Sequence, residues 1–327
     1  MDEEGIWQEE QGATEKIILE YFSSIFSSDH PSCFEASLEA VGERVTPEMN
    51  DALLGNFKAD EVWHALQQMH PMKSPGPNGM SPIFYQKYWN IVGVCVSNCV
   101  LQALNTGVMP KDFNNTYICL IPKIKNPQKI TDYRPISLCN VIYKLISKVL
   151  ANRLKRILNE VITDAQSAFV PGRLISDNVV VAFETMHTIG KRKKGKEGLM
   201  AIKLDMSKAY DRVEWGYLEA IMRKMGFSER WISLVMMCVT TVSYEILING
   251  EPRGKITPSR GLRQGDPISP YLFLLCAEGL SALIRKKEAM GLLRGVGVSK
   301  QAPMVSYFFF ADDSIIFCRA TMEECKQ

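Results

Sequence analysis

One stretch near the end of the chain constrains the fold more than any other. Residues 307–318 have the sequence YFFFADDSIIFC, in which Asp312 and Asp313 separate two runs of aromatic and β-branched residues. Such runs are typical of β-strands, and the short acidic break predicts a β-hairpin with both aspartates at its tip. Turns favour aspartate in any case, so the pair alone is a weak signal. Two unpaired carboxylates at the tip of an apolar hairpin nevertheless require a positively charged partner. Divalent cations that prefer oxygen ligands are the usual partner.

A second acidic segment lies far upstream in a similar setting. Residues 199–205, LMAIKLD, predict a buried strand that ends in Asp205. If two neighbouring buried strands deliver Asp205, Asp312 and Asp313 to one edge of a sheet, these carboxylates can hold two metal ions. Two Mg²⁺ ions a few ångströms apart are the arrangement that serves phosphoryl transfer, and Mn²⁺ is a possible substitute.

Five motifs, in order along the chain, resemble those of reverse transcriptases from non-LTR retrotransposons. Their sequences are most similar to those of plant long interspersed elements. They are LIPK at 120–123, DYRPISL at 132–138, KLDMSKAYD at 203–211, GLRQGDPISPYLF at 261–273 and FADD at 310–313. The resemblance implies an α+β, right-hand polymerase fold with an antiparallel palm sheet. Residues 1–69 would form an acidic helical spacer, and 70–327 the reverse transcriptase domain, with fingers at about 70–190 and palm at about 191–320.

The resemblance also assigns roles to single residues. It implies that Asp205, Asp312 and Asp313 are the catalytic metal ligands. Arg134, on the second arm of a predicted fingers hairpin, is the best candidate for a contact with the incoming triphosphate, because a guanidinium forks across phosphate oxygens and stays charged. Lys123 is a weaker second candidate, for which a plain surface lysine is an equal alternative.

Further positions lie close to the predicted metal site. In the family the position of Tyr210 holds an aromatic ring that excludes a ribose 2′-hydroxyl, which favours deoxynucleotides; a core tyrosine is the alternative. Gln264 and Gly265 match positions beside the nascent base pair, and Arg263 is expected to reach a backbone phosphate. The spacing of Asp211 points it away from the metal site.

These features predict an RNA-directed DNA polymerase that joins a deoxynucleoside triphosphate to a primer 3′-hydroxyl, with an RNA template and a DNA primer as partners. The chain ends soon after Asp313, so a thumb is expected to be missing and the sequence to be a truncated copy. The alternative is a catalytically inert relic that at most binds nucleic acid. A polymerase that copies RNA into RNA is disfavoured by Tyr210.

Charge is unevenly distributed along the chain. The net charge is +2, but the first 60 residues carry 14 acidic and 3 basic side chains, so the remainder is basic and suited to a polyanion. The clearest predicted helix, 142–158, has a basic face that either is solvated or contacts a phosphate backbone: Lys144, Lys148, Lys155 and Arg156. The run KRKKGK at 191–196 predicts a solvated loop, with a nuclear localisation patch as the alternative.

Other features bear on compartment and local structure. The nine cysteines show no zinc-ligand spacing and are expected to be reduced thiols. The acidic start differs from a signal peptide and no membrane span is expected, so an intracellular protein is predicted. Further helices are predicted at about 17–26, 83–89, 213–225, 229–239 and 269–290, with a hairpin at 244–256 that turns at Asn249-Gly250.

Overall fold

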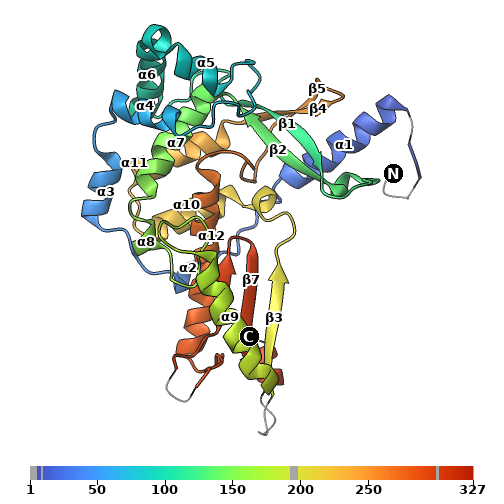
Figure 1. The fold of residues 1–327 in the computed structure, drawn as a ribbon, viewed down its shortest axis with the longest axis vertical. Coiled ribbons are helices and arrows are strands. Elements are labelled where there is room, and N and C mark those ends of the chain that lie inside the picture. The colour runs from blue at the N-terminus through green and yellow to red at the C-terminus, as the bar shows by residue number, and fades with distance from the viewer. Residues whose placement is uncertain (1–5, 9, 192–197, 300–301, 327) are drawn as a thin grey trace.

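The computed structural model describes residues 6–8, 10–191, 198–299 and 302–326. Mixed helices and strands form a broad helical body that carries one sheet, and a narrower extension that contains the other (Figure 1). The α+β fold class predicted from the sequence is therefore confirmed. Within these residues no helix has both the length and the apolar character needed to cross a membrane.

The first sheet has four strands in the order β2-β1-β4-β5. Its strands are β1 (Asn115–Pro122), β2 (Tyr133–Cys139), β4 (Ser243–Ile248) and β5 (Glu251–Ile256). The β1–β2 and β4–β5 pairs are antiparallel hairpins, and β1 and β4 join them by parallel pairing. The β4–β5 turn uses Asn249 and Gly250, both with positive φ, as the sequence predicted.

The second sheet has three antiparallel strands in the order β3-β7-β6. Its strands are β3 (Leu199–Asp205), β6 (Tyr307–Phe310) and β7 (Asp313–Arg319). The predicted acidic hairpin is thus confirmed. The expectation that β3 is buried is wrong: it pairs with β7 on one side only, and Ile202 and Leu204 are 36% and 41% exposed.

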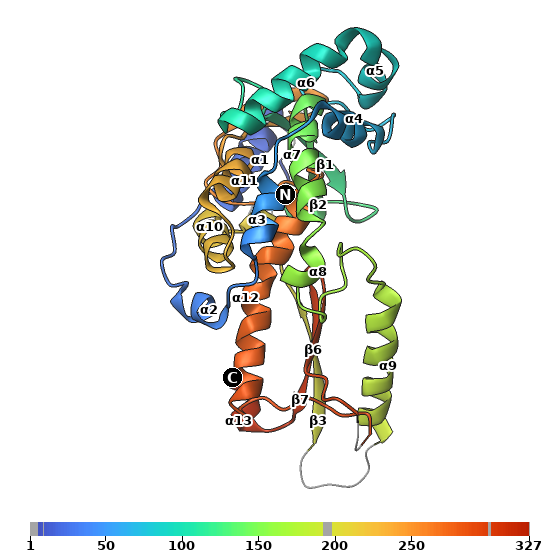
Figure 2. The ribbon, with the colours of Figure 1, turned by 90° about the vertical axis from the view of Figure 1, so that its left-hand side faces the viewer.

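Helices pack around both sheets. The second sheet lies between α9 (Ile175–Lys191) on one face and α12 (Ser269–Ala289) on the other (Figure 2). The helical body consists of α3 (Pro47–Leu54), α4 (Ala59–Gln67), α5 (Pro82–Lys87), α6 (Trp89–Thr106), α7 (Val141–Leu154), α8 (Leu158–Val161), α10 (Trp215–Lys224) and α11 (Glu229–Thr240). Shorter helical turns are η1 (Ile130–Asp132), η2 (Tyr210–Arg212) and α13 (Met322–Cys325).

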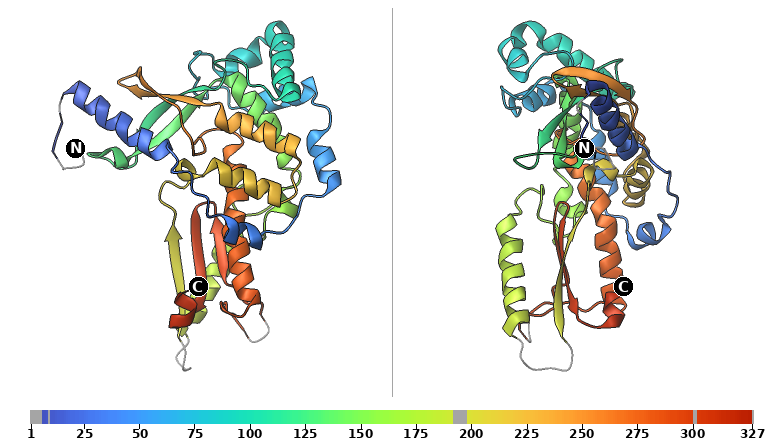
Figure 3. Two further views of the ribbon diagram at one scale, coloured as in Figure 1. Left: turned by 180° about the vertical axis from the view of Figure 1, so that it is seen from behind. Right: turned by 90° about the vertical axis from the view of Figure 1, so that its right-hand side faces the viewer.

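The acidic N-terminal segment packs against the rest of the fold. Helix α1 (Gln11–Phe26) lies along the four-stranded sheet (Figure 3), and its Phe22 and Phe26 share a core cluster with Tyr244 and Ile246. Helix α2 (Glu35–Ala40) packs against α12. Helix α1 therefore belongs to the folded body, because its apolar face packs against the four-stranded sheet.

The predicted basic face of helix 142–158 is only partly solvated. The helix divides into α7 and α8, and Lys144 is buried, where its Nζ donates to the Ser74 carbonyl oxygen at 3.1 Å. Gly76 in the same loop lies so close to Asn140 that an added Cβ would fall 2.3 Å from the Asn140 nitrogen. Lys144 therefore fastens the loop to α7 and is withdrawn from any phosphate. Of the predicted run 191–196, only Lys191 lies within the described residues.

A buried ion pair connects the centre of the helical body to the first sheet. Arg263 Nη2 lies 3.0 Å from Asp266 Oδ2, and both side chains are only 3% exposed. The Tyr143 hydroxyl donates to the same carboxylate oxygen at 2.6 Å, and the guanidinium carbon lies 4.0 Å from the Tyr143 ring centre. Arg263 also donates to Asn114 and to the Cys238 carbonyl oxygen. The expectation that Arg263 reaches a backbone phosphate is therefore wrong, because its donors are used inside the protein.

We expect Asp266→Ala to lower the free energy of unfolding by about 3–5 kcal/mol, because it leaves the Arg263 charge buried without its carboxylate. Urea denaturation followed by circular dichroism measures the change. Glu20→Ala removes an exposed partner of Lys16 and should change the same quantity by less than about 1 kcal/mol. An equal decrease in the free energy of unfolding in both variants would show that the buried pair stabilises the fold no more than an exposed pair does.

Candidate active site

The pairing of β3 with β7 brings the predicted carboxylates to one end of the second sheet. Asp205 lies opposite Asp313 in the antiparallel register, so the two side chains project from the same face. Asp312 occupies the turn between β6 and β7, next to Ala311, whose φ is 54°. The sequence prediction that two strands deliver these carboxylates to one edge is therefore confirmed.

Two side chains that support the hairpin tip were not singled out from the sequence. Gln166, 1% exposed, accepts hydrogen bonds at 3.0 Å from the backbone N–H groups of Ala168 and Ala311. Asn178 on α9 donates to the Phe309 carbonyl oxygen at 3.2 Å. These contacts fix the turn that carries Asp312. The only local signal is the segment QSAFVPGR at 166–173, which resembles a block of the same family between fingers and palm.

A lysine lies where a cation is expected. Lys203 Nζ lies 3.0 Å from Asp313 Oδ1, and the two side chains are 68% and 54% exposed. The hydrogen bond to Asp313 raises the pKa of Lys203. Among the described residues, no three His, Cys, Asp or Glu side chains are gathered closely enough to hold a metal ion. The donor chemistry fits hard divalent cations, but in this arrangement Asp313 is engaged by Lys203.

Tyr210 lies beside the acidic tip. It begins the helical turn η2, five residues after Asp205, and its ring stacks on Phe273 of α12 with centroids 4.8 Å apart and planes at 10°. Burial raises the pKa of Tyr210, and the nearby charge of Asp312 adds to the shift. The ring is thus packed on α12 and lies near enough to Asp312 to sense its charge.

The loop before α12 connects the second sheet to the first. The Gln264 side-chain amide donates to Asp211 Oδ1 at 3.2 Å, and the Gln264 carbonyl oxygen accepts from the Ser137 N–H of β2 at 2.9 Å. Gly265 has φ 111°, and an added Cβ would lie 3.2 Å from the Ser137 carbonyl oxygen. Asp211 is 2% exposed, and burial raises its pKa. The exclusion of Asp211 from the metal site agrees with its role as a buried hydrogen-bond acceptor.

The two predicted triphosphate ligands lie on the β1–β2 hairpin. Arg134 is exposed on β2, opposite Ile121, and its side chain makes no hydrogen bond or ion pair with any described residue. Lys123 follows β1, and its Nζ donates to the Thr131 carbonyl oxygen at 2.8 Å. Burial lowers the pKa of Lys208 in the turn after Asp205, and the charge of Lys123 lowers it further.

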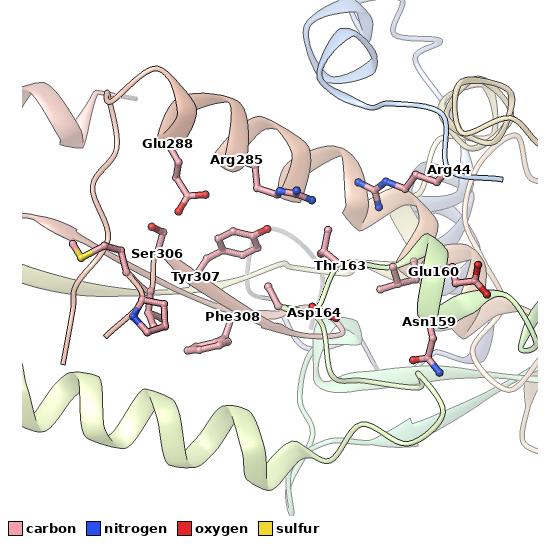
Figure 4. Close-up of a pocket in the computed structure, with 15 residues that line it drawn as sticks. Arg44, Asn159, Glu160, Thr163, Asp164, Arg285, Glu288, Ser306, Tyr307 and Phe308 are labelled. Atoms are coloured by element: carbon pink, nitrogen blue, oxygen red, sulfur yellow. The ribbon is translucent and has the colours of Figure 1, made fainter. Parts of the chain in front are cut away.

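A cavity of about 770 Å³ lies on the other side of β6. Figure 4 shows Arg285 and Glu288 of α12 above it, Tyr307 and Phe308 below, and Asn159 and Glu160 at one end. Its lining includes none of the three aspartates. A smaller cavity of about 230 Å³, between α9 and the sheet, is lined in part by Lys203 and Asp313. Asp313 therefore borders the smaller cavity on the α9 side of the sheet.

Known proteins resemble the chain along most of its length. An uncharacterised 149 kDa protein of transposon TX1 from Xenopus laevis is 29% identical over 99% of the chain. The retrovirus-related Pol polyprotein from the type-2 retrotransposable element R2DM of Drosophila melanogaster is 23% identical over 94% of the chain. The retrovirus-related Pol polyprotein from the type-1 retrotransposable element R2 of Nasonia vitripennis is 29% identical over 74% of the chain. The chain spans 25%, 27% and 22% of these three relatives.

The model of one protein family matches residues 121–327, described as reverse transcriptase (RNA-dependent DNA polymerase). The match covers β2, the paired strands that carry the three aspartates, Tyr210 and the loop before α12. By this match the chain belongs to the reverse transcriptase family.

Proposed function

We propose that the chain is the RNA-directed DNA polymerase region of a non-LTR retrotransposon. The observation that carries the proposal is the register of β3 and β7, which sets Asp205 opposite Asp313 with Asp312 in the adjoining turn. The names of the relatives support a retrotransposon origin. The proposed reaction is attack of a primer 3′-hydroxyl on the α-phosphate of a deoxynucleoside triphosphate, directed by an RNA template.

Asp205, Asp312 and Asp313 would hold the divalent ions, two Mg²⁺ or Mn²⁺. When bound, such ions lower the pKa of the attacking hydroxyl and neutralise the charge of the triphosphate and of the leaving pyrophosphate. Lys203 has to release Asp313 for this carboxylate to become a ligand, since one oxygen is engaged at 3.0 Å. The pair is exposed, so the release costs little.

The remaining site residues would bind the nucleotide. Arg134 is exposed with unused guanidinium donors, which suits a contact with the triphosphate. Tyr210, clamped on Phe273, would exclude a ribose 2′-hydroxyl. Gln264 and Gly265 would lie beside the nascent base pair, where the absence of a Cβ at Gly265 allows close approach of the backbone.

In the right-hand description, we assign residues of about 70–190 to the fingers and about 191–320 to the palm, with the acidic helices of 1–69 packed against them. The β1–β2 hairpin would be the fingertip, and β3, β6, β7 and α12 the palm core. The hairpin β4–β5 continues the sheet of β1–β2, so the two subdomains would share one sheet at their boundary.

We expect Asp312→Asn to abolish incorporation of labelled deoxythymidine triphosphate on poly(rA)/oligo(dT) with Mg²⁺, because the amide removes a charged ligand. Asp51→Asn, which changes an exposed acid on α3, should leave the rate unchanged. Circular dichroism verifies that each protein is folded. Incorporation that survives in Asp312→Asn, or a folded wild-type chain with no incorporation, would contradict the proposal.

We expect Lys203→Met to tighten Mn²⁺ binding roughly twofold to fivefold, because an ammonium that competes for Asp313 is removed. Electron paramagnetic resonance of free Mn²⁺ measures the affinity without requiring catalysis. Lys255→Met, at an exposed position on β5, is the matched control. The gain should vanish when Asp313→Asn is added; a gain that persists there would show that Lys203 acts elsewhere.

We expect Tyr210→Ala to reduce the preference for deoxynucleotides over ribonucleotides by about tenfold or more, because the ring that blocks the 2′-hydroxyl is lost. The ratio of kcat/KM for the two nucleotides measures this preference. Tyr210→Phe keeps the ring and the stacking on Phe273, and should retain the preference. An unchanged ratio in Tyr210→Ala would assign Tyr210 to the core only.

A further inference from the structure

The turn that carries Asp312 needs support from outside the hairpin. Ala311 and Asp312 are the residues between β6 and β7, and Ala311 has a φ of 54°. Turns of this length with a left-handed first residue normally have glycine there, because a Cβ makes this conformation unfavourable. A strained residue of this kind persists only where the surrounding structure holds it. A contact from another segment must therefore fix the Ala311 peptide.

Gln166 supplies that contact. Its Oε1 accepts hydrogen bonds at 3.0 Å from the N–H groups of Ala311 and Ala168, and its side chain is buried. Since both neighbours are donors, the amide oxygen has to face them and the amide nitrogen has to face away. Nε2 is buried and has no hydrogen-bond partner among the described residues. The fold thus tolerates an unpaired donor in Gln166 in order to keep an acceptor at the Ala311 N–H.

The backbone of Gln166 is itself held against β6. Gln166 forms a parallel bridge with Phe309. The Phe309 N–H donates to the Ala165 carbonyl oxygen at 2.8 Å, and the Phe309 carbonyl oxygen accepts from the Ser167 N–H at 3.2 Å. Asn178 of α9 donates to the same Phe309 oxygen at 3.2 Å and to Ser167 Oγ at 2.9 Å. This segment therefore covers the outer edge of β6, and Gln166 reaches the turn from a fixed backbone.

Asp312 depends on the turn more than the other two carboxylates do. Asp205 and Asp313 lie opposite each other in the register of β3 and β7, which fixes their backbones. The Asp312 side chain makes no hydrogen bond or ion pair with any residue that the structure describes. Its direction is therefore set by the backbone of the turn, and the hydrogen bond from Ala311 to Gln166 holds that backbone.

We propose that Gln166 is a positioning residue of the metal site. Its Oε1 holds the Ala311 N–H and thereby directs the Asp312 carboxylate toward the site of Asp205 and Asp313. The inference rests on the proposed function and adds to it a residue that touches neither metal nor substrate. Groups that orient a metal ligand contribute to metal affinity, whereas a merely structural amide contributes to stability alone. Metal affinity compared with stability therefore separates the two roles.

The first test measures Mn²⁺ affinity by electron paramagnetic resonance of free Mn²⁺, which requires no catalysis. Gln166→Met keeps nearly the same size without the acceptor oxygen, and should weaken Mn²⁺ binding about tenfold. Gln166→Glu keeps an oxygen at the same place and should recover most of the lost affinity. Wild-type affinity in a folded Gln166→Met protein, or an equal loss of affinity in both variants, would overturn the proposal.

The second test uses a matched amide in the helical body to separate positioning from stability. Asn50 on α3 accepts from the Ser228 N–H and donates to the Gly226 carbonyl oxygen, both at 2.8 Å. Asn50→Leu should lower the melting temperature at least as much as Gln166→Met does, because it also leaves backbone groups unpaired. Its Mn²⁺ affinity should equal that of the wild type. Weaker Mn²⁺ binding in Asn50→Leu to the same extent would make lost stability the cause, and Gln166 would then be structural.

The third test separates this inference from the proposed function. In the active enzyme, Gln166→Met should lower kcat about tenfold and leave the KM for deoxythymidine triphosphate within about twofold, because the proposed nucleotide contacts are unchanged. A higher Mn²⁺ concentration should restore part of kcat. A wild-type chain whose Mn²⁺ affinity depends on Gln166 but which adds no nucleotide would refute the proposed function alone. Unchanged kcat and Mn²⁺ affinity in Gln166→Met would refute the positioning role and leave the proposed function standing.

Discussion

The ion pair of Arg263 with Asp266 is the interaction on which the arrangement of the site depends. The pair lies before α12, and its partners come from three other segments. Tyr143 lies on α7, Cys238 on α11 and Asn114 before β1. Burying two charges costs stability unless their remaining donors and acceptors form hydrogen bonds. In this pair most of them do, through Tyr143, Asn114 and Cys238. The network therefore specifies where the loop with Gln264 and Gly265 meets β2. From that point the Gln264 side chain reaches Asp211 in the turn that follows β3.

Much of the site could be predicted from the sequence because its signals are local. The alternation of apolar runs with Asp205, Asp312 and Asp313 is enough to predict two strands and a tip, and the structure pairs them as expected. The chemistry of these residues also follows from residue type. The catalytic roles proposed for these residues stay predictions.

What the sequence did not reveal depends on distant partners. Arg263 looks like an exposed cation in its own segment, but besides Asp266 it donates to Cys238, 25 residues away, and to Asn114, 149 residues away. Lys144 follows the helical period of a solvated face, yet the carbonyl that it binds is 70 residues upstream. The apolar run of β3 predicted burial, although only one side of the strand is paired. Periodicity describes one element, whereas burial depends on the elements around it.

The two sheets also have a consequence for how the chain folds. Strand β1 pairs in parallel with β4, and the side chains of Asn115 and Ser243 that meet there are 128 residues apart. Strand β3 likewise pairs with β7, which lies more than 100 residues further along the chain. Pairings between distant segments form slowly because a long loop must close first. During synthesis the β1–β2 hairpin and the helices α3–α7 can form early, while the carboxylates meet only after β7 has left the ribosome.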